Sequence, residues 1–184
     1  LFHDMLDSTE EVYLKYRGEA LEKAYFTHIP NGLPIAPPPF ASNTPEMLTD
    51  KNLQAKLRTG LDEKPIQFIK EGMYFLQADT SSHKGMMVYN FGPHYPRIKT
   101  PREMLRPLRY LLSSEEYNSM KNRPNLKLAI DNYWLGISNN AQEARQLIRI
   151  YYNRVTFANL YFTSLTQGWK TDRGMIYTVF GPPH

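Results

Sequence analysis

The segment of residues 168–184 constrains the fold more than any other part of this 184-residue chain. Gly168 and Gly174 bracket a turn of polar side chains, and the apolar run that follows stops at Gly-Pro-Pro. A short apolar run between such signals is typical of a buried strand, because glycine and proline interrupt regular structure. We therefore expect a turn at 168–174, a short strand at 176–180 and then an exit from the fold.

The same segment resembles a known family motif. It reads Gly-Trp-x-Thr-Asp-Arg-Gly from Gly168 to Gly174, followed by Tyr177 and by Gly-Pro-Pro from Gly181 to Pro183. This pattern resembles the defining motif of the GWxTD domain family, found mainly in secreted and cell-envelope proteins of Bacteroidota. The resemblance implies a helical domain commonly preceded by a β-rich region, and it implies no activity because the family has none established. Since relatives continue where this chain ends, we expect the domain to be truncated at its carboxyl end.

Each residue of the motif has a structural interpretation. The two glycines can supply positive φ angles on either side of the turn, and Trp169 can bury its ring against helices while its indole N–H finds an acceptor. Asp172 can accept backbone N–H groups in an Asx-type turn, and Thr171 can do so more weakly. Arg173 can pair with an acid or with carbonyl groups at a helix end.

The motif also has a binding interpretation, because loops on rigid scaffolds often carry function and Trp and Arg are favoured in binding sites. Residue chemistry alone leaves both interpretations open. The candidate contact residues are Gly168, Trp169, Thr171, Asp172, Arg173, Gly174, Tyr177, Gly181, Pro182 and Pro183.

Residues 1–96 read as a β-rich region. Its β-prone runs lie at residues 12–16, 24–29, 66–69, 73–78 and 86–91. The first two runs indicate a strand pair, and the turn sequence at 79–85 predicts a hairpin between the last two. Because two hairpins cannot cover both faces of a sheet, we expect part of a β-sandwich-like domain. An extended proline connector is expected at 30–39 and a weakly helical stretch at 44–61.

Residues 97–184 read as a helical domain with clear start signals. Thr100 with Glu103, and Ser113 with Glu116, have the spacing of capping boxes. Pro124 and Asn140 are expected to open two further helices, of which the last is the longest. Its stripe of apolar residues should be buried and comprises Ala144, Leu147, Ile148, Tyr151, Val155, Ala158 and Phe162. The expected fold class is therefore α+β, with the motif turn and short strand at its end.

Composition excludes several classes of protein and site. The chain has no cysteine, which excludes disulfides, thiolate metal sites and thiol nucleophiles. Its net charge of +4 comes from dispersed charges, so we expect no nucleic-acid partner. Arg145 and Arg149 form a basic pair that could grip a phosphate or a carboxylate, but a solvated basic face is the commoner arrangement and is the one we expect. No apolar run approaches the length of a membrane-spanning helix, although a lipid anchor before Leu1 would be compatible with this sequence.

No catalytic signature is present, and catalysis is the less favoured interpretation. The five histidines lack the spacings that bring metal ligands or a base onto one face; they are His3, His28, His83, His94 and His184. Nucleophile-elbow, phosphate-loop and dinucleotide signatures are also absent from the sequence. We therefore assign no catalytic, cofactor-binding or metal-binding residue.

The favoured functional hypothesis is a non-enzymatic interaction or scaffold module of the bacterial cell envelope, periplasmic or outer-membrane-associated. The family resemblance implies export, and 13 tyrosines suit contacts with proteins and with sugars. We expect other envelope proteins as partners, in an outer-membrane-associated assembly. The alternative is a protein that binds or processes a glycan or peptidoglycan. Exposed aromatics around a groove with two nearby carboxylates would favour the glycan, whereas an apolar patch with a polar rim would favour a protein.

Overall fold

The computed structural model describes residues 5–6, 9–16, 19–20, 22–30, 55–61, 63–81 and 83–182. Contacts within the chain define two compact units. The first contains Leu1–Pro34 and Met47–Pro93, and the second contains Ile35–Glu46 and His94–His184. The first unit is built from strands and the second from helices, which confirms the expected α+β class.

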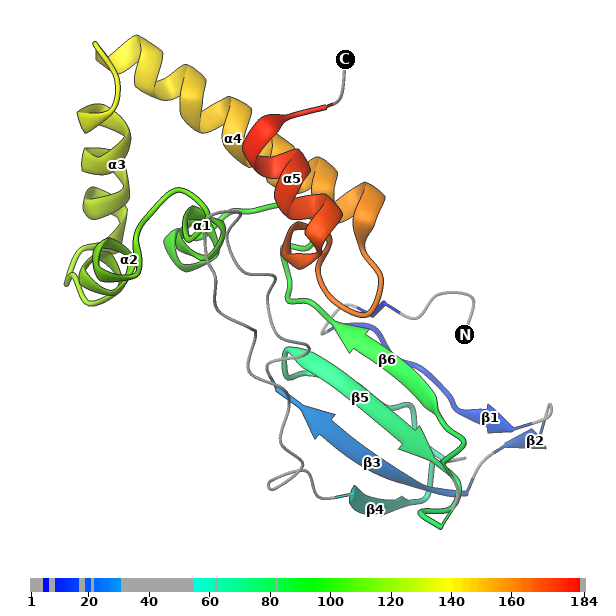
Figure 1. Ribbon diagram of the computed structural model, residues 1–184. Helices are drawn as coiled ribbons and strands as arrows, with labels where there is room; N and C mark the ends of the chain where they lie inside the picture. Colours follow the sequence, from blue (N-terminus) through cyan, green and yellow to red (C-terminus); the bar gives the residue numbers. More distant parts are fainter. Residues whose placement is uncertain are drawn as a thin grey trace. The chain divides into compact units, whose positions relative to one another are not determined.

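Four antiparallel strands form the main sheet of the first unit (Figure 1). They are β3 (Lys23–Ile29), β4 (Ala55–Thr59), β5 (Gly72–Gln77) and β6 (Met86–Asn90), in the order β4-β3-β5-β6. β5 and β6 form the predicted hairpin, in which Met73 lies opposite Tyr89 and Phe75 opposite Met87. The described part of the chain thus contains one large sheet layer, and it includes no second sheet of sandwich size.

The runs at residues 12–16 and 24–29 do not pair with each other, so the first expected strand pair is wrong. Lys15–Tyr16 (β1) pairs with Glu19–Ala20 (β2) in a short ribbon, whereas β3 pairs with β4 and β5. The run at 66–69 forms no strand, since Ile66 makes only a single bridge to Val12. Pairing partners come from distant parts of the chain, so β-propensity located these runs without identifying their neighbours.

Residues 55–59 form the strand β4, which contradicts the expectation of a weakly helical stretch over residues 44–61. All five residues of this strand are exposed, yet their backbone pairs along β3. The Arg58 guanidinium lies over the Phe26 ring, 4.8 Å from its centroid, which adds a side-chain contact across the two strands. Residues 44–54 and 31–39, where the remaining helical expectation and most of the proline connector fall, lie outside the described residues.

The sheet unit has its own apolar core. Phe68 lies beside Phe26 and Tyr74, with ring centroids 6.1 and 4.8 Å apart. The other buried members are Leu6, Leu14, Ala24, Leu61, Ile66, Leu76 and Val88. Because these residues come from strands and from the loops around them, the loops are part of the core.

The first two helices begin at the predicted capping boxes. α1 (Pro101–Leu108) has Thr100 as its N-cap, and α2 (Ser114–Lys121) has Ser113. In each, the N-cap side chain accepts the backbone N–H three residues on, and the Glu at that position reaches back to the N-cap N–H. α1 ends one residue after Pro107, whose missing backbone N–H weakens the last turn of the helix.

α3 (Leu126–Gly136) starts later than expected, because Asn125 and not Pro124 supplies the cap, through its Oδ1 to the Leu128 N–H. The long helix α4 (Ala141–Phe162) begins at Asn140, whose Oδ1 accepts from the Glu143 N–H, as predicted. No helix in the described part of the chain is long and apolar enough to cross a membrane.

The expected strand at 176–180 is wrong, because these residues belong to α5 (Asp172–Phe180). Gly174, Met175 and Thr178 are buried while Ile176 and Phe180 are exposed, a pattern with the period of a helix. A short apolar run does not distinguish a strand from a helix, and here a cap before it decides for the helix. α5 lies along α4 and runs antiparallel to it (Figure 1).

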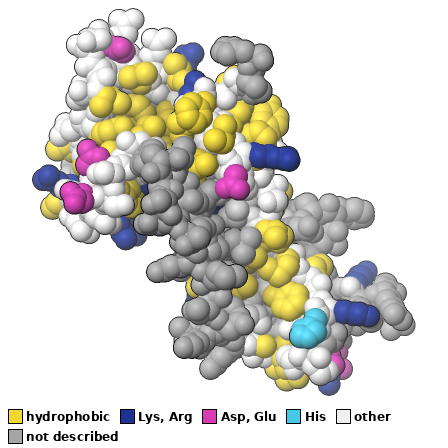
Figure 2. All heavy atoms as spheres, in the orientation of Figure 1, with side chains coloured by type: hydrophobic (Ala, Val, Ile, Leu, Met, Phe, Trp, Pro, Cys, Tyr) yellow, Lys and Arg dark blue, Asp and Glu magenta, His cyan; other side chains and the backbone are white. Residues whose placement is uncertain are grey.

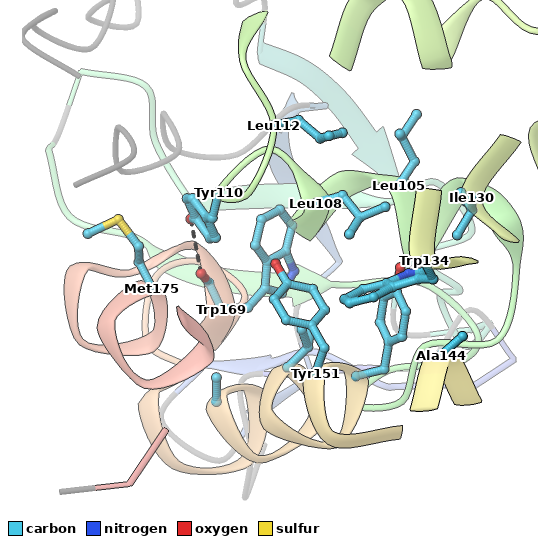
Figure 3. Packing of buried hydrophobic residues seen from close by; sticks show 13 residues of the cluster. Leu105, Leu108, Tyr110, Leu112, Ile130, Trp134, Ala144, Tyr151, Trp169 and Met175 are labelled. Atoms are coloured by element: carbon cyan, nitrogen blue, oxygen red, sulfur yellow. Dashed lines mark hydrogen bonds between the residues drawn. The ribbon is translucent and has the colours of Figure 1, made fainter. Parts of the chain in front are cut away.

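The helices share one core, shown in Figure 3. Leu108 of α1, Ile130 of α3 and Val155 of α4 are each 0% exposed, so three helices meet there. The other buried members are Leu105, Tyr110, Leu112, Trp134, Ala144, Tyr151, Tyr152, Ala158, Trp169 and Met175. Tyr151 donates to the Pro107 carbonyl at 2.6 Å, and burial raises the pKa of its phenol well above the usual value.

Candidate functional site

The motif turn is a one-turn 3-10 helix, Gly168–Lys170 (η2), that leads into α5. Thr171 joins the two, since its hydroxyl donates to the Gly168 carbonyl at 2.8 Å and accepts from the Gly174 N–H at 3.0 Å. Thr171 is therefore the N-cap of α5. The expectation that Asp172 would be the main turn-capping acceptor is wrong, because it is the first residue of the helix itself.

Gly168 allows the turn to lie directly on the backbone of α4. A Cβ atom at this position would overlap the Ala158 carbonyl and come within 2.8 Å of Asn159 Cα. Real Cβ atoms do not approach backbone atoms so closely. The Gly168 N–H is also satisfied, because it donates to Thr163 Oγ1 at 2.9 Å.

Gly174 allows α5 to fold back onto the turn. A Cβ atom here would overlap the Gly168 carbonyl and lie 3.0 Å from Trp169 Cα. Neither Gly168 nor Gly174 is among the described glycines with positive φ, so the expectation that these two residues supply positive φ angles to the turn is wrong. Both positions are glycine because a neighbouring backbone occupies the space of a side chain.

Trp169 is 1% exposed and lies in the helical core, as predicted. Its indole N–H donates to Gln167 Oε1 at 2.9 Å, which provides the expected acceptor. The Tyr110 ring meets the indole edge-on with centroids 5.8 Å apart, and the Tyr110 hydroxyl donates to the Trp169 carbonyl at 3.1 Å (Figure 3). The turn is thus tied to the segment after α1.

Asn159 is a motif partner that sequence reasoning missed. It is 3% exposed in α4, where its Oδ1 accepts the Trp169 N–H at 3.3 Å and its Nδ2 donates to the Pro96 carbonyl at 2.8 Å. A buried amide must be hydrogen-bonded on both sides to be stable. The available signal was an asparagine directly after Ala158, within the apolar stripe of the helix.

Asp172 and Arg173 are exposed in the first turn of α5. Burial raises the pKa of Tyr110, nearby Arg109 opposes that shift, and the charge of Asp172 adds to it. The carboxylate also lies at the positive end of the helix dipole. No hydrogen bond or ion pair of Arg173 is found among the described residues, so the expected structural partner of this side chain is not seen.

The end of the motif closes the helix. Tyr177 packs against Phe162 of α4, with ring centroids 5.6 Å apart. Gly181 has a φ of 89°, and its N–H donates to the Tyr177 carbonyl at 2.8 Å, which terminates α5. Arg154 of α4 donates to the Val179 carbonyl at 3.0 Å, a helix-end contact that the sequence did not indicate. Pro182 is exposed, and Pro183 lies outside the described residues.

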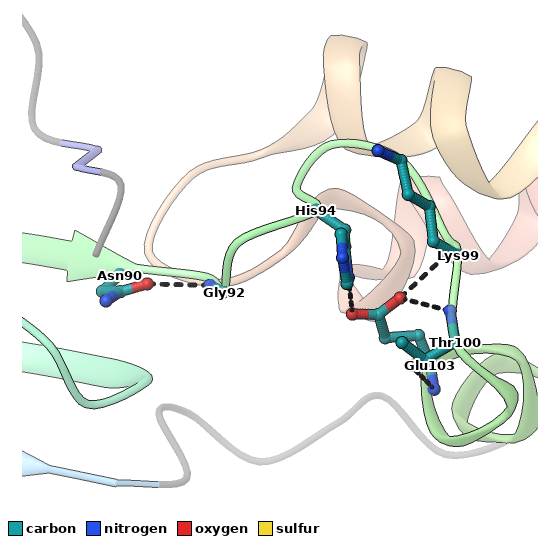
Figure 4. A network of polar contacts seen from close by, with 6 residues as sticks. All are labelled: Asn90, Gly92, His94, Lys99, Thr100 and Glu103. Atoms are coloured by element: carbon teal, nitrogen blue, oxygen red, sulfur yellow. Dashed lines mark hydrogen bonds and ion pairs between the residues drawn. The ribbon is translucent and has the colours of Figure 1, made fainter. Parts of the chain in front are cut away.

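Potential acid–base and metal chemistry is limited within the described residues. His94 Nδ1 lies 2.7 Å from Glu103 Oε1, but the other Glu103 oxygen accepts the Lys99 and Thr100 N–H groups, each at 2.8 Å (Figure 4). Burial alone would raise the pKa of the Glu103 carboxyl, yet these hydrogen bonds lower it. The pair therefore anchors the start of α1. No cluster of metal-ligating side chains occurs in the described residues, and His3 and His184 lie outside them.

A different surface of the helical unit has the properties of a contact site. We define the α4/α5 outer face by its exposed apolar residues, which are Ile150, Phe157, Leu160 and Tyr161 of α4 with Ile176 and Phe180 of α5. Their exposed fractions run from 41% for Ile150 to 67% for Phe180. Figure 2 shows hydrophobic side chains gathered over this region of the helical unit, with both basic and acidic side chains near them.

Aromatic contacts lead from the exposed residues of α4 to α5 through the half-buried rings of Phe162 and Tyr177. Phe157 and Tyr161 stack 6.0 Å apart, Tyr161 meets Phe162 at 6.4 Å, and Phe162 meets Tyr177 of α5. Sequence analysis missed the face because it followed only the buried stripe. The signal was nevertheless present, since six of the eight residues at 155–162 are apolar, more than a single buried stripe requires.

Comparison with known proteins identifies a family. The family model of the GWxTD domain matches residues 72–184. The search of curated proteins found no match, and neither did the search of solved structures.

Proposed function

The chain belongs to the GWxTD domain family, and on that premise we propose that it is a non-enzymatic interaction module that binds another protein through its helical unit. The observation that carries this proposal is the α4/α5 outer face. High exposure is ordinary for a charged side chain or a single apolar one, but a connected set of exposed apolar residues marks an interaction site. Exposed polar positions such as Asn153 and Arg173 border the apolar set.

The motif residues have a structural role in this proposal, whereas the α4/α5 outer face makes the contact. Gly168, Trp169, Thr171 and Gly174 hold the turn, α4 and α5 together through close packing and hydrogen bonds. That packing fixes the position of α5 on α4 and so creates the outer face. The motif therefore builds the contact surface, and of its residues Asp172 and Arg173 are exposed beside it.

We also propose that the protein works in the bacterial cell envelope, as a subunit of an outer-membrane-associated assembly. The support is the kind of protein in which this family is mainly found, together with a sequence free of cysteine. A bacterial envelope protein can do without disulfides and thiol chemistry, so this composition is compatible with export.

A glycan partner is the second candidate, and one observation favours it. Phe157 and Tyr161 present nearly parallel exposed rings, with an interplanar angle of 11°, and sugars stack on such rings. Binding of peptidoglycan fragments that is lost in Tyr161→Ser would support this candidate over the protein partner.

The proposed function can be tested by purification of the full-length protein from its own membranes in gentle detergent. Tyr161→Ser and Phe180→Ser, at 66% and 67% exposure, should lose a stoichiometric protein partner while remaining folded. The matched controls are Leu128→Ser and Leu135→Ser on α3, at 54% and 48% exposure, which should keep it. A wild-type protein that comes out alone would contradict the proposal.

A further inference from the structure

We infer that the segment which covers the α4/α5 outer face is an amphipathic helix of another protein, with Asp and Glu side chains flanking its apolar stripe. The inference rests on the proposed function and specifies the chemistry of the partner. It follows from the backbone of the face, from its charges and from its residue types.

The face offers no backbone hydrogen bonds to a partner, so the backbone N–H and C=O groups of the partner must be hydrogen-bonded within the partner itself. α4 and α5 bond their N–H and C=O groups internally, and they present only side chains to a partner. An extended segment docked here would bury unpaired backbone groups, because these helices offer no sheet edge to pair with. A helix carries its own hydrogen bonds and can bury an apolar stripe at little such cost.

The dimensions suit a short helix. The apolar stripe of α4 extends from Ile150 to Tyr161, which corresponds to about 16 Å along the helix axis at the usual rise per residue. A partner helix of about three turns would span this length.

The charges at the ends of the face are mostly positive. Arg145 and Arg149 are exposed in the first half of α4, before the apolar stripe, and Arg173 is exposed at the start of α5. Because α5 runs antiparallel to α4, Arg173 lies toward the opposite end of the face from the other two. Two acids lie nearby and keep their negative charge: Asp172 is exposed beside Arg173, and Glu143 in the first turn of α4 accepts hydrogen bonds from Asn139.

The helical part of the chain, residues 94–184, adds to this bias. Residues 94–184 contain thirteen Lys and Arg against six Asp and Glu, a net charge of +7. A second copy bound through the same face would place two such units together, with like charges opposed. A partner with acidic flanks would meet opposite charges instead.

The residue types favour a protein over a lipid surface. The basic residues at the ends are arginines, and the protruding apolar residues include a tyrosine and two phenylalanines. Arg and aromatic residues are enriched in protein interfaces, whereas Lys is depleted there. α4 and α5 contain no lysine, although surface-lying membrane helices use lysine freely.

The test is site-specific photo-crosslinking in the native host with the full-length protein. A photoreactive phenylalanine derivative is placed at Tyr161 or, separately, at Phe180, and at Leu135 of α3 as control. We expect crosslinks from both face positions, but not from Leu135, that map by mass spectrometry to an apolar helical segment flanked by acids. A synthetic peptide of that segment should bind the purified chain, and Arg145→Glu with Arg149→Glu should weaken it at least about tenfold.

The other outcomes separate the two proposals. A crosslink to a protein segment without acidic flanks, or to a second copy of this chain, would overturn the inference and leave the proposed interaction function standing. A crosslink to lipid, or face positions that react no more than Leu135, would overturn both. An unchanged peptide affinity in the charge-reversal variant would overturn the role of the arginines.

Discussion

At the scale of single residues, the motif glycines are determined by their neighbours in space. Gly168 faces the carbonyl of Ala158, and Gly174 faces the carbonyl of Gly168 itself. Backbone atoms cannot move aside as the end of a flexible side chain can. A Cβ atom at Gly168 would therefore push the turn away from α4, and a Cβ atom at Gly174 would push α5 away from the turn. This requirement explains why both motif positions are glycine.

Gly174→Ala is expected to lower the free energy of unfolding by about 2–3 kcal/mol, because the new methyl group would force the Gly168 carbonyl away. Chemical denaturation measures this directly. Gly136→Ala is the matched control, since a Cβ atom at Gly136 would have no neighbour within 4 Å and this residue occupies the last position of α3. The control should be neutral or stabilising by up to about 1 kcal/mol, and equal effects of the two changes would refute the close-packing explanation.

At the scale of elements, α5 depends on a cap that belongs to the motif. Thr171→Ala removes the acceptor for the Gly174 N–H and should destabilise the protein by about 1 kcal/mol. Thr171→Ser should retain most of the stability because its hydroxyl can make the same bond. Asp172→Ala should cost only a few tenths of a kcal/mol, through the helix dipole, in thermal melts at low salt. A larger loss of stability in Asp172→Ala than in Thr171→Ala would show that Asp172, and not Thr171, caps the helix.

The start of α1 should make stability depend on pH. The Glu103 pKa is lowered from its usual value of 4.5, so the folded state binds its proton less readily than the unfolded state does. The resulting stabilisation is present above about pH 4.5 and is lost as the pH falls through the lowered pKa. Glu103→Gln should therefore be less stable than wild type at neutral pH and should approach it in acid. Parallel curves of stability against pH for the two proteins would contradict this assignment.

Sequence patterns predicted these elements where the determining contacts are local. Thr100, Ser113 and Asn140 each bond a backbone group three residues away, so the sequence alone contains the whole interaction. The strand β4 was mispredicted because its structure depends on a distant partner, β3. The helix α5 was mispredicted because its local start signal, the Thr171 cap, was interpreted as part of a turn. The burial of Trp169 was predictable from its size, whereas its link to Asn159 required the folded helix.

At the scale of the whole molecule, the chain has two separate apolar cores. One is built on the sheet around Phe68, and the other joins the helices around Leu108, Val155 and Trp169. Regions with separate cores open in separate cooperative steps when the contacts between them are weaker than those within them. A substitution that destabilises one core should then leave the stability of the other unit unchanged.

Trp169→Ala tests this independence. Removal of a ring that is 1% exposed should destabilise the helical unit by roughly 3–5 kcal/mol. Hydrogen exchange followed by mass spectrometry should show faster exchange throughout α4 and α5, while amides of the β5–β6 hairpin keep their wild-type protection. Phe68→Ala, at 2% exposure in the sheet core, should give the reverse pattern. Loss of protection across both units in either variant would show that they unfold as one cooperative body, and a partner that binds the helical unit would then stabilise the sheet as well.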